Sequence, residues 1–255
     1  MAREELDLVL RTAMPQDAAA VAQLYSDTRR AAVPQMPVAH HTEQQNLDFI
    51  THLIEGSAEV WLAESPRLTS PIGFLALEGD WLNSLYVLPG WTGQGVGSSL
   101  LDLVKAIRPG GFALWVFESN TNARAFYARR GLVTVRRTDG AGNEEKAPDL
   151  HMMWPGEDPV AALRDAIDET DRELARILDL RAGLTAEIQA HKSGGSGSAP
   201  RDPDREAAIV ANMTPFAPRL GQGRLRSIMH AVIGESLAAV AEDANSPRAR
   251  DVGGV

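Results

Sequence analysis

The chain has 255 residues, 44% of them apolar and 23% charged, and a formal net charge of −9. This length and apolar content suit two globular domains. The negative balance argues against a nucleic-acid-binding protein, since the only grouped cations lie on one helix discussed below. The absence of cysteine excludes disulfides, thiolate nucleophiles and cysteine-ligated zinc.

Other signals narrow the class further. No His or carboxylate cluster has metal-ligand spacing, so we expect no metal site. No apolar run reaches membrane-spanning length, and the first seven residues lack the profile of a signal peptide. We therefore expect a cytoplasmic protein that binds neither membranes nor nucleic acid.

Residues 1–155 alternate strand-like and helix-like stretches. Short apolar runs bounded by Gly, Pro or polar turns predict strands, and amphipathic stretches predict helices. The sum is an α/β domain with a sheet and flanking helices. The expected strands are 8–11, 58–63, 72–78, 81–88 and 112–117, and the expected helices are 16–30, 42–55, 96–107 and 121–130.

A glycine-rich turn follows the strand expected at 81–88 and opens the next helix. Gly93, Gly95 and Gly97 let the backbone approach a phosphate, whose charge is met by free N–H groups at the helix N-terminus. The turn lacks the Lys-Ser/Thr ending of a P-loop, and its glycines do not have the dinucleotide-binding spacing. One strand later comes a second motif, Asn120-x-x-Ala123-x-x-Phe126-Tyr127-x-x-x-Gly131-Leu132.

The two motifs together resemble the GNAT superfamily of acetyl-CoA-dependent N-acyltransferases, over residues 7–154. The resemblance implies a GNAT-like mixed sheet, acetyl-CoA as cosubstrate and an amine, which the sequence does not identify, as acceptor. It also implies that Tyr127 protonates the departing thiolate as general acid; a packed aromatic is the alternative role. The implied cofactor-binding positions are Leu85, Val87, Thr92, Gly93, Gln94, Gly95, Val96, Gly97, Ser98 and Asn120.

The sequence does not identify the general base of the acetyltransferase half. GNAT enzymes often carry a Glu on the strand before the glycine turn, but residues 81–84 offer no carboxylate. Glu118 and Asp80 are weak candidates, and an ordered water relay is an equal alternative. His40 and His41 could serve a substrate pocket, although a solvated helix entry explains them more simply.

The second half begins with one long expected helix, residues 158–192. Asp158 and Pro159 are a helix-start signal, and two glycines follow Lys192. Cations interrupt the apolar stripe, and a buried cation is costly unless an anion meets it. The stripe consists of Val160, Leu163, Ile167, Leu174, Ile177, Leu178, Leu184 and Ile188, with Arg181 and Lys192 on the same face and Arg164 at its edge.

The spacing of these cations predicts a dimer. At the rise of an α-helix Arg181 and Lys192 are ~16 Å apart, so both could close on one small anion. Arg164 lies ~42 Å from Lys192 and must serve a symmetry-related site if it binds the same ligand. A coiled-coil helix with charges flanking its seam is the alternative.

Two further helices are expected, one opening at Arg201 and one over about residues 224–240. Several separated polar positions recur in order along all three helices: Arg164, Asp168, Asp171, Arg181, Lys192, the run Arg201-Asp202-x-x-Arg205-Glu206, and Glu235-Ser236. This arrangement resembles the all-helical AroQ class of chorismate mutases over residues 158–241. We therefore expect a GNAT domain at 1–155, a three-helix AroQ-type domain at 156–243 and a flexible tail at 244–255.

The AroQ resemblance implies rearrangement of chorismate to prephenate, a step of aromatic amino acid biosynthesis, in a homodimer and without a cofactor. Arg181 and the other chain's Arg164 would clamp the two carboxylates, and Lys192 would face the ether oxygen. Glu206 and Asp202 would hold the ring hydroxyl, Arg205 would support a carboxylate, and Ser236 would add a hydrogen bond. Asp202 before Pro203 is equally well explained as a helix cap.

Val240 departs from the family pattern. The family commonly has Gln or Glu there, paired with the lysine at the ether oxygen, and valine cannot donate a hydrogen bond. Lys192 then works alone or the activity is weak. Three hypotheses follow: a bifunctional mutase and N-acetyltransferase, an acetyltransferase with a mutase-like dimerisation and ligand-sensing module, or a mutase acting on 4-amino-4-deoxychorismate.

Overall fold

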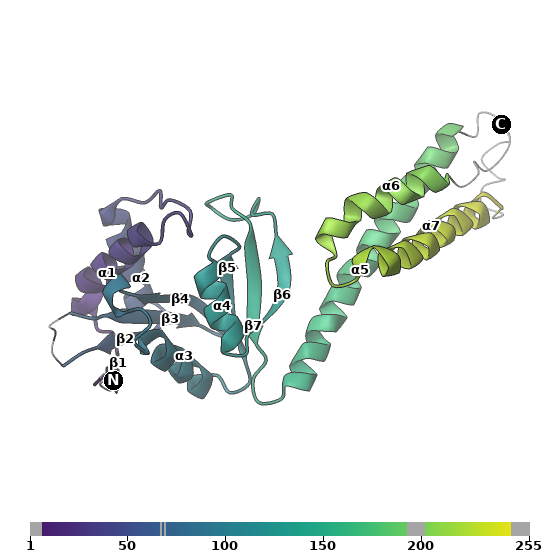
Figure 1. Ribbon diagram of the computed structural model, residues 1–255. Helices are drawn as coiled ribbons and strands as arrows, with labels where there is room; N and C mark the ends of the chain where they lie inside the picture. Colours follow the sequence, from purple (N-terminus) through teal and green to yellow (C-terminus); the bar gives the residue numbers. More distant parts are fainter. Residues whose placement is uncertain (1–6, 67, 69, 193–201, 246–255) are drawn as a thin grey trace. The chain divides into compact units, whose positions relative to one another are not determined.

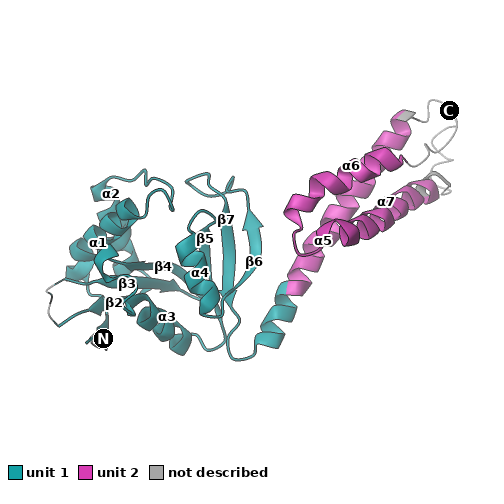
Figure 2. Ribbon diagram, in the orientation of Figure 1, with its two compact units in different colours: residues 1–166 teal, residues 167–255 magenta. Residues whose placement is uncertain are grey.

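The computed structural model describes residues 7–66, 68, 70–192 and 202–245 (Figure 1). The chain forms two compact units, residues 1–166 and 167–255 (Figure 2). No helix among the described residues is both long enough and apolar enough to cross a membrane.

The first unit is built on a seven-stranded sheet in which every neighbouring pair is antiparallel except β4 and β5. The parallel pair lies in the middle of the sheet and connects through a helix, as parallel pairs require. In spatial order the strands are β1 (Val9–Thr12), β2 (Glu59–Glu64), β3 (Gly73–Glu78), β4 (Trp81–Val87), β5 (Phe112–Phe117), β7 (Asp149–Trp154) and β6 (Val133–Thr138).

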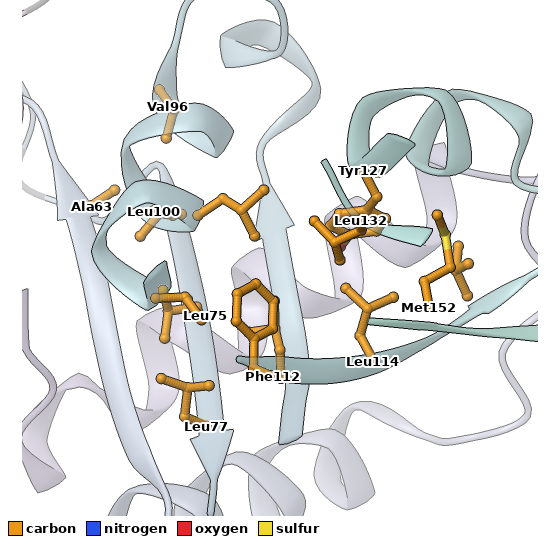
Figure 3. Packing of buried hydrophobic residues seen from close by; sticks show 14 of the residues in the cluster. Ala63, Leu75, Leu77, Val96, Leu100, Phe112, Leu114, Tyr127, Leu132 and Met152 are labelled. Atoms are coloured by element: carbon orange, nitrogen blue, oxygen red, sulfur yellow. The ribbon is translucent and has the colours of Figure 1, made fainter. Parts of the chain in front are cut away.

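Helices cover both faces of this sheet (Figure 1). One face packs on α3 (Val96–Ile107) and α4 (Thr121–Arg129) through a cluster that includes Leu100, Leu114 and Tyr127 (Figure 3). The other packs on α1 (Ala18–Ala31) and α2 (Glu43–Glu55) through a cluster that includes Ile50 and Phe74. Alternation along the strands supplies the two apolar faces.

The described residues of the second unit contain three α-helices, α5 (Pro159–Lys192), α6 (Pro203–Met213) and α7 (Gly221–Asn245), although the first turns of α5 belong to the first unit. The buried core of the second unit is small and includes Val210, Leu225 and Met229. By contrast Ile177, which is 54% exposed, and Leu184 lie in a row of exposed apolar side chains along α5.

The expected elements are present, with two strands added. β6 and β7 were not predicted, because their apolar residues are mixed with two arginines in β6 and with Asp149 and His151 in β7. Helix α7 begins and ends further out than the expected 224–240. The fold is a mixed α/β sheet with flanking helices followed by three helices, as expected.

Candidate functional site

The parallel strands β4 and β5 diverge. They pair at one position, Trp81 with Ala113, and beyond it their facing edges separate. A cavity of about 760 Å³ lies in the gap, lined by both strands together with α1, α4 and the loop between β6 and β7. A gap in a sheet leaves backbone N–H and C=O groups unpaired along both edges, and these can pair with an extended ligand.

One wall of the cavity comes from α4. Asn120 caps this helix, since its side-chain oxygen accepts from the Ala123 amide at 3.1 Å, and it also lines the cavity. Tyr127 lines the cavity from a buried position beside Leu132 (Figure 3). Burial raises the pKa of the Tyr127 phenol, so it keeps its proton at neutral pH.

The glycine-rich turn is open around its backbone. Gly93 and Gly95 have φ of 74° and 100°, the left-handed region, and added Cβ atoms would meet nothing within 4 Å. Gly95 caps α3, and the first helical bond runs from the Ser99 amide to the Gly95 carbonyl. The amides of residues 96–98 come before this first bond, so they have no acceptor within the helix. They form a group of N–H donors suited to a phosphate.

The rest of the turn is tied down by side chains. The Thr92 hydroxyl donates to the Pro89 carbonyl at 2.8 Å, and Gln94 Nε2 donates to the Gly90 carbonyl at 2.7 Å. These two side chains therefore stabilise the turn from within. Leu85 and Val87 both pack against the α3 side of the sheet, and Leu85 also lines the cavity.

The opposite end of the cavity lies on the face of the sheet that α1 covers, and it contains an ion pair. Arg29, which is 6% exposed, donates from Nη2 to Glu145 Oε1 at 2.8 Å. Tyr25 and Tyr86 meet edge to face beside this pair, with ring centroids 5.0 Å apart. Burial raises the pKa of both phenols, so this end presents two neutral hydroxyl groups and one ion pair.

Hydrogen bonds fix the loop that brings Glu145 to the cavity. Asn143 Nδ2 donates to the Ala147 carbonyl at 2.7 Å and to Asp149 Oδ2 at 3.0 Å. Asp149 also accepts from the Thr138 hydroxyl. His41 Nε2 lies 2.8 Å from Glu144 Oε1 in the same loop.

The two carboxylates considered as general base lie elsewhere. Glu118 pairs with Arg137 at 3.1 Å, and Asp80 is exposed near Arg108. Neither lines the cavity, whereas Glu145 and Asp149 do. Sequence reasoning missed these two because it did not recognise the strands on either side of their loop.

In the helical unit Arg181 of α5 reaches α7. Its Nη1 donates to Ser236 Oγ at 2.7 Å, and Ser236 is buried. Ser236 Oγ donates its own proton to the Val232 carbonyl at 2.7 Å. The hydroxyl therefore acts as an acceptor for Arg181, and it must leave Val232 before it can donate to a ligand.

The remaining mutase positions are spread over the three helices. Asp202 is the cap of α6, accepting from the amides of Asp204 and Arg205 at 3.1 and 3.0 Å. Glu206 is half-buried, lies 3.8 Å from His230 and lines a cavity of about 220 Å³ between α6 and α7. Of the other predicted residues, Arg164 and Arg205 are exposed and Val240 is half-buried. The side chain of Lys192 lies outside the part of the chain that the structure describes.

Two family models match the chain. Residues 56–133 match the acetyltransferase (GNAT) domain, and residues 163–240 match chorismate mutase type II. The chain is a GNAT acetyltransferase domain fused to a type II chorismate mutase domain. Both models are described by the name of an enzyme.

Curated relatives that are named as acetyltransferases match part of the chain. The peptidyl-lysine N-acetyltransferase YjaB of Salmonella typhimurium is 30% identical over 98 residues, 38% of this chain and 66% of the relative. The protein of the same name from Escherichia coli is 28% identical over 39% of this chain and 66% of its own. The matches thus span just under two thirds of each relative. The solution structure of apo YjaB from Escherichia coli is similar, with 21% identity, coverage of 58% and 98%, and a TM-score of 0.49.

Proposed function

We propose that the GNAT domain transfers the acetyl group of acetyl-CoA to an amine. The observation that carries this proposal is the cavity between β4 and β5, which has Tyr127 in one wall. The pantetheine arm would pair with the free strand edge at Leu85 and Val87, and the pyrophosphate would bind the amides after Gly95. The neutral phenol of Tyr127 would donate its proton to the departing thiolate.

We further propose that the helical domain converts chorismate to prephenate. This rearrangement needs no proton transfer, so holding the reactive conformer and stabilising charge are sufficient. Arg181 supports the proposal, because its hydrogen bond to Ser236 holds the guanidinium in place. A guanidinium binds a carboxylate bidentately, and chorismate carries two carboxylates. Lys192, Arg205 and Glu206 complete the proposed site together with Asp202, which also caps α6.

The proposed mutase site includes Arg164 of a second copy. On one helix Arg164 and Arg181 are 17 positions apart, ~25 Å, too far for one small dianion. The exposed apolar row along α5 offers the surface on which a second copy would pack. Ile177→Asp should give a monomer by light scattering, and Ala190→Asp, on the exposed opposite side of α5, should stay dimeric.

The functional domains we propose are residues 1–155 and 156–243. Helix α7 continues to Asn245, beyond the predicted start of the tail at residue 244, and residues 246–255 of that tail lie outside the described part of the chain. The acetyl acceptor is a separate question, because the curated relatives are named for peptidyl-lysine acetylation. A lysine side chain of a protein is therefore one candidate acceptor. The amine of 4-amino-4-deoxychorismate, rearranged by the same chain, is another.

Turnover assays on the purified protein test both activities. We expect loss of chorismate absorbance at a rate well above the uncatalysed one, and thiol release from acetyl-CoA that needs both an amine and Tyr127. No chorismate turnover by a dimer that still binds chorismate would favour the alternative function, a ligand-sensing module. Val240, which lacks the usual donor, is the observation in favour of that alternative.

A further inference from the structure

Three side chains form a row across the sheet at the rim of the large cavity. Trp115 of β5 pairs with His151 of β7, and His151 pairs with Arg136 of β6. Directly paired residues point to the same face of a sheet, so the three lie side by side. The Trp115 and His151 rings are 5.1 Å apart, and Trp115 and Arg136 both line the cavity.

A β-bulge places Arg136 in this row. Thr134 pairs with Met152, and regular pairing would bring Val135 opposite His151. The register shifts there by one residue, so Arg136 takes the position instead. A bulge re-aims side chains, and here it exchanges an apolar residue for a cation at the cavity.

Arg136 forms no ion pair with a described carboxylate, whereas two nearby arginines do. Arg137 pairs with Glu118 at 3.1 Å, and Arg29 pairs with Glu145 at 2.8 Å. The Asp149 carboxylate, which also lines the cavity, accepts from Thr138 and Asn143. Among the described residues no carboxylate pairs with Arg136, and its side chain is exposed.

The surroundings of Arg136 suit an organic anion. Trp115 is 45% exposed and offers a flat apolar surface in the same row as Arg136, with His151 between them. Burial, followed by the nearby Arg136, lowers the pKa of His151, so its ring is neutral at pH 7 and Arg136 is the cation of this row. A guanidinium next to an apolar surface binds a carboxylate or phosphate attached to a carbon skeleton.

We propose that the acetyl acceptor is a small amine that carries an anionic group, which Arg136 binds at the rim of the cavity while Trp115 contacts the adjoining carbon skeleton. This inference rests on the proposed acetyltransferase function and names its substrate class. Glu145 lines the same cavity on the α1 face, and its Oε1 accepts from Arg29. Its second carboxylate oxygen would accept from the acceptor ammonium. The cavity would thus bind a zwitterion, with the amine held inward and the anion outward.

Matched acceptor pairs test the proposal. Thiol release from acetyl-CoA is measured with each genetically encoded amino acid and its decarboxylated amine, with phosphoethanolamine and ethanolamine, and with a lysine peptide blocked at both ends. We expect at least one anionic acceptor to exceed its uncharged partner about tenfold or more in kcat/KM. The phosphate and carboxylate arms show which anion is preferred.

Two neighbouring variants locate the effect. Arg136→Gln should raise KM for the anionic acceptor about tenfold or more, and leave the KM for acetyl-CoA and kcat/KM for the uncharged amine unchanged. Arg137→Gln, one residue along the strand but outside the cavity, should match wild type. Circular dichroism and thermal unfolding check that both variants are folded.

The inference is overturned if the lysine peptide or the uncharged amines are the better acceptors, if nothing in the panel is acetylated although acetyl-CoA binds, or if the two variants behave alike. Acetylation of the peptide would leave the acetyltransferase function intact. Failure to bind acetyl-CoA, measured by calorimetry, would instead remove the proposed function itself and this inference with it.

Discussion

Arg181 Nη1 donates a hydrogen bond of 2.7 Å to Ser236 Oγ, joining α5 to α7. A hydrogen bond to a charged group stabilises the folded arrangement by about 1.5–3 kcal/mol. Without this bond the Arg181 guanidinium should no longer be held in one position. We expect Ser236→Ala to lower kcat/KM for chorismate about tenfold or more, measured by chorismate absorbance.

Ser227→Ala is the matched control for that variant. Ser227 lies on the same helix, and its hydroxyl likewise donates to the carbonyl four residues earlier, at 3.4 Å to Gly223, but it is exposed. The control should turn over chorismate like wild type. Equal rates for Ser236→Ala and wild type would show that Arg181 does not depend on Ser236.

Val240 lies one turn after Ser236 on α7 and cannot donate a hydrogen bond. Val240→Gln should therefore raise kcat for chorismate by about tenfold or more, because a donor near a developing oxyanion stabilises the transition state. Val240→Leu changes size without adding a donor and should not raise it. A similar gain in kcat in both variants would show that the effect comes from side-chain packing and not from the added donor.

Gly95 occupies φ of 100° at the start of α3, whereas Gly90 in the same turn has no positive φ. A side chain at Gly95 should strain the backbone by about 1–3 kcal/mol and misplace the amides that follow. We expect Gly95→Ala to weaken acetyl-CoA binding about tenfold by calorimetry, while Gly90→Ala binds like wild type. Equal affinities would contradict the pyrophosphate site.

Tyr127→Phe keeps the packing of a buried ring and removes the proton donor. We expect kcat for acetyl transfer to fall about 100-fold, within the range of general acid catalysis, with acetyl-CoA affinity unchanged. In wild type the raised pKa of Tyr127 keeps the phenol protonated past its ordinary value of about 10, so kcat should not fall through this group below that pH. An undiminished kcat in Tyr127→Phe would leave Tyr127 a packing residue.

Local patterns predicted most of the fold. Helix α5 was predicted almost residue by residue, because Asp158 and Pro159 form a start signal and the apolar spacing is regular over 34 residues. The glycine turn was predicted from its own residues, since positive φ and open amides are local properties. Family likeness then supplied Arg181 and Ser236 as members of one site, and the structure places them in contact.

The acceptor end of the large cavity could not be predicted. Arg29 and Glu145 are 116 positions apart, and their contact depends on the complete sheet. Arg136 reaches the cavity through a one-residue shift in pairing with β7, and the pattern of a single strand carries no sign of its partner's register. The positions of the residues proposed to bind the acceptor therefore depend on how the strands pair, which the local sequence pattern does not show.

The mutase site is most directly tested by subunit complementation. Arg164→Ala and Arg181→Ala chains with different tags are coexpressed, and the heterodimer is purified through both tags. If each site takes Arg181 from one chain and Arg164 from the other, one site of the heterodimer is intact and chorismate turnover returns to about half of wild type. A heterodimer as inactive as the two single-variant homodimers, or a chain that is monomeric while active, would contradict the shared site.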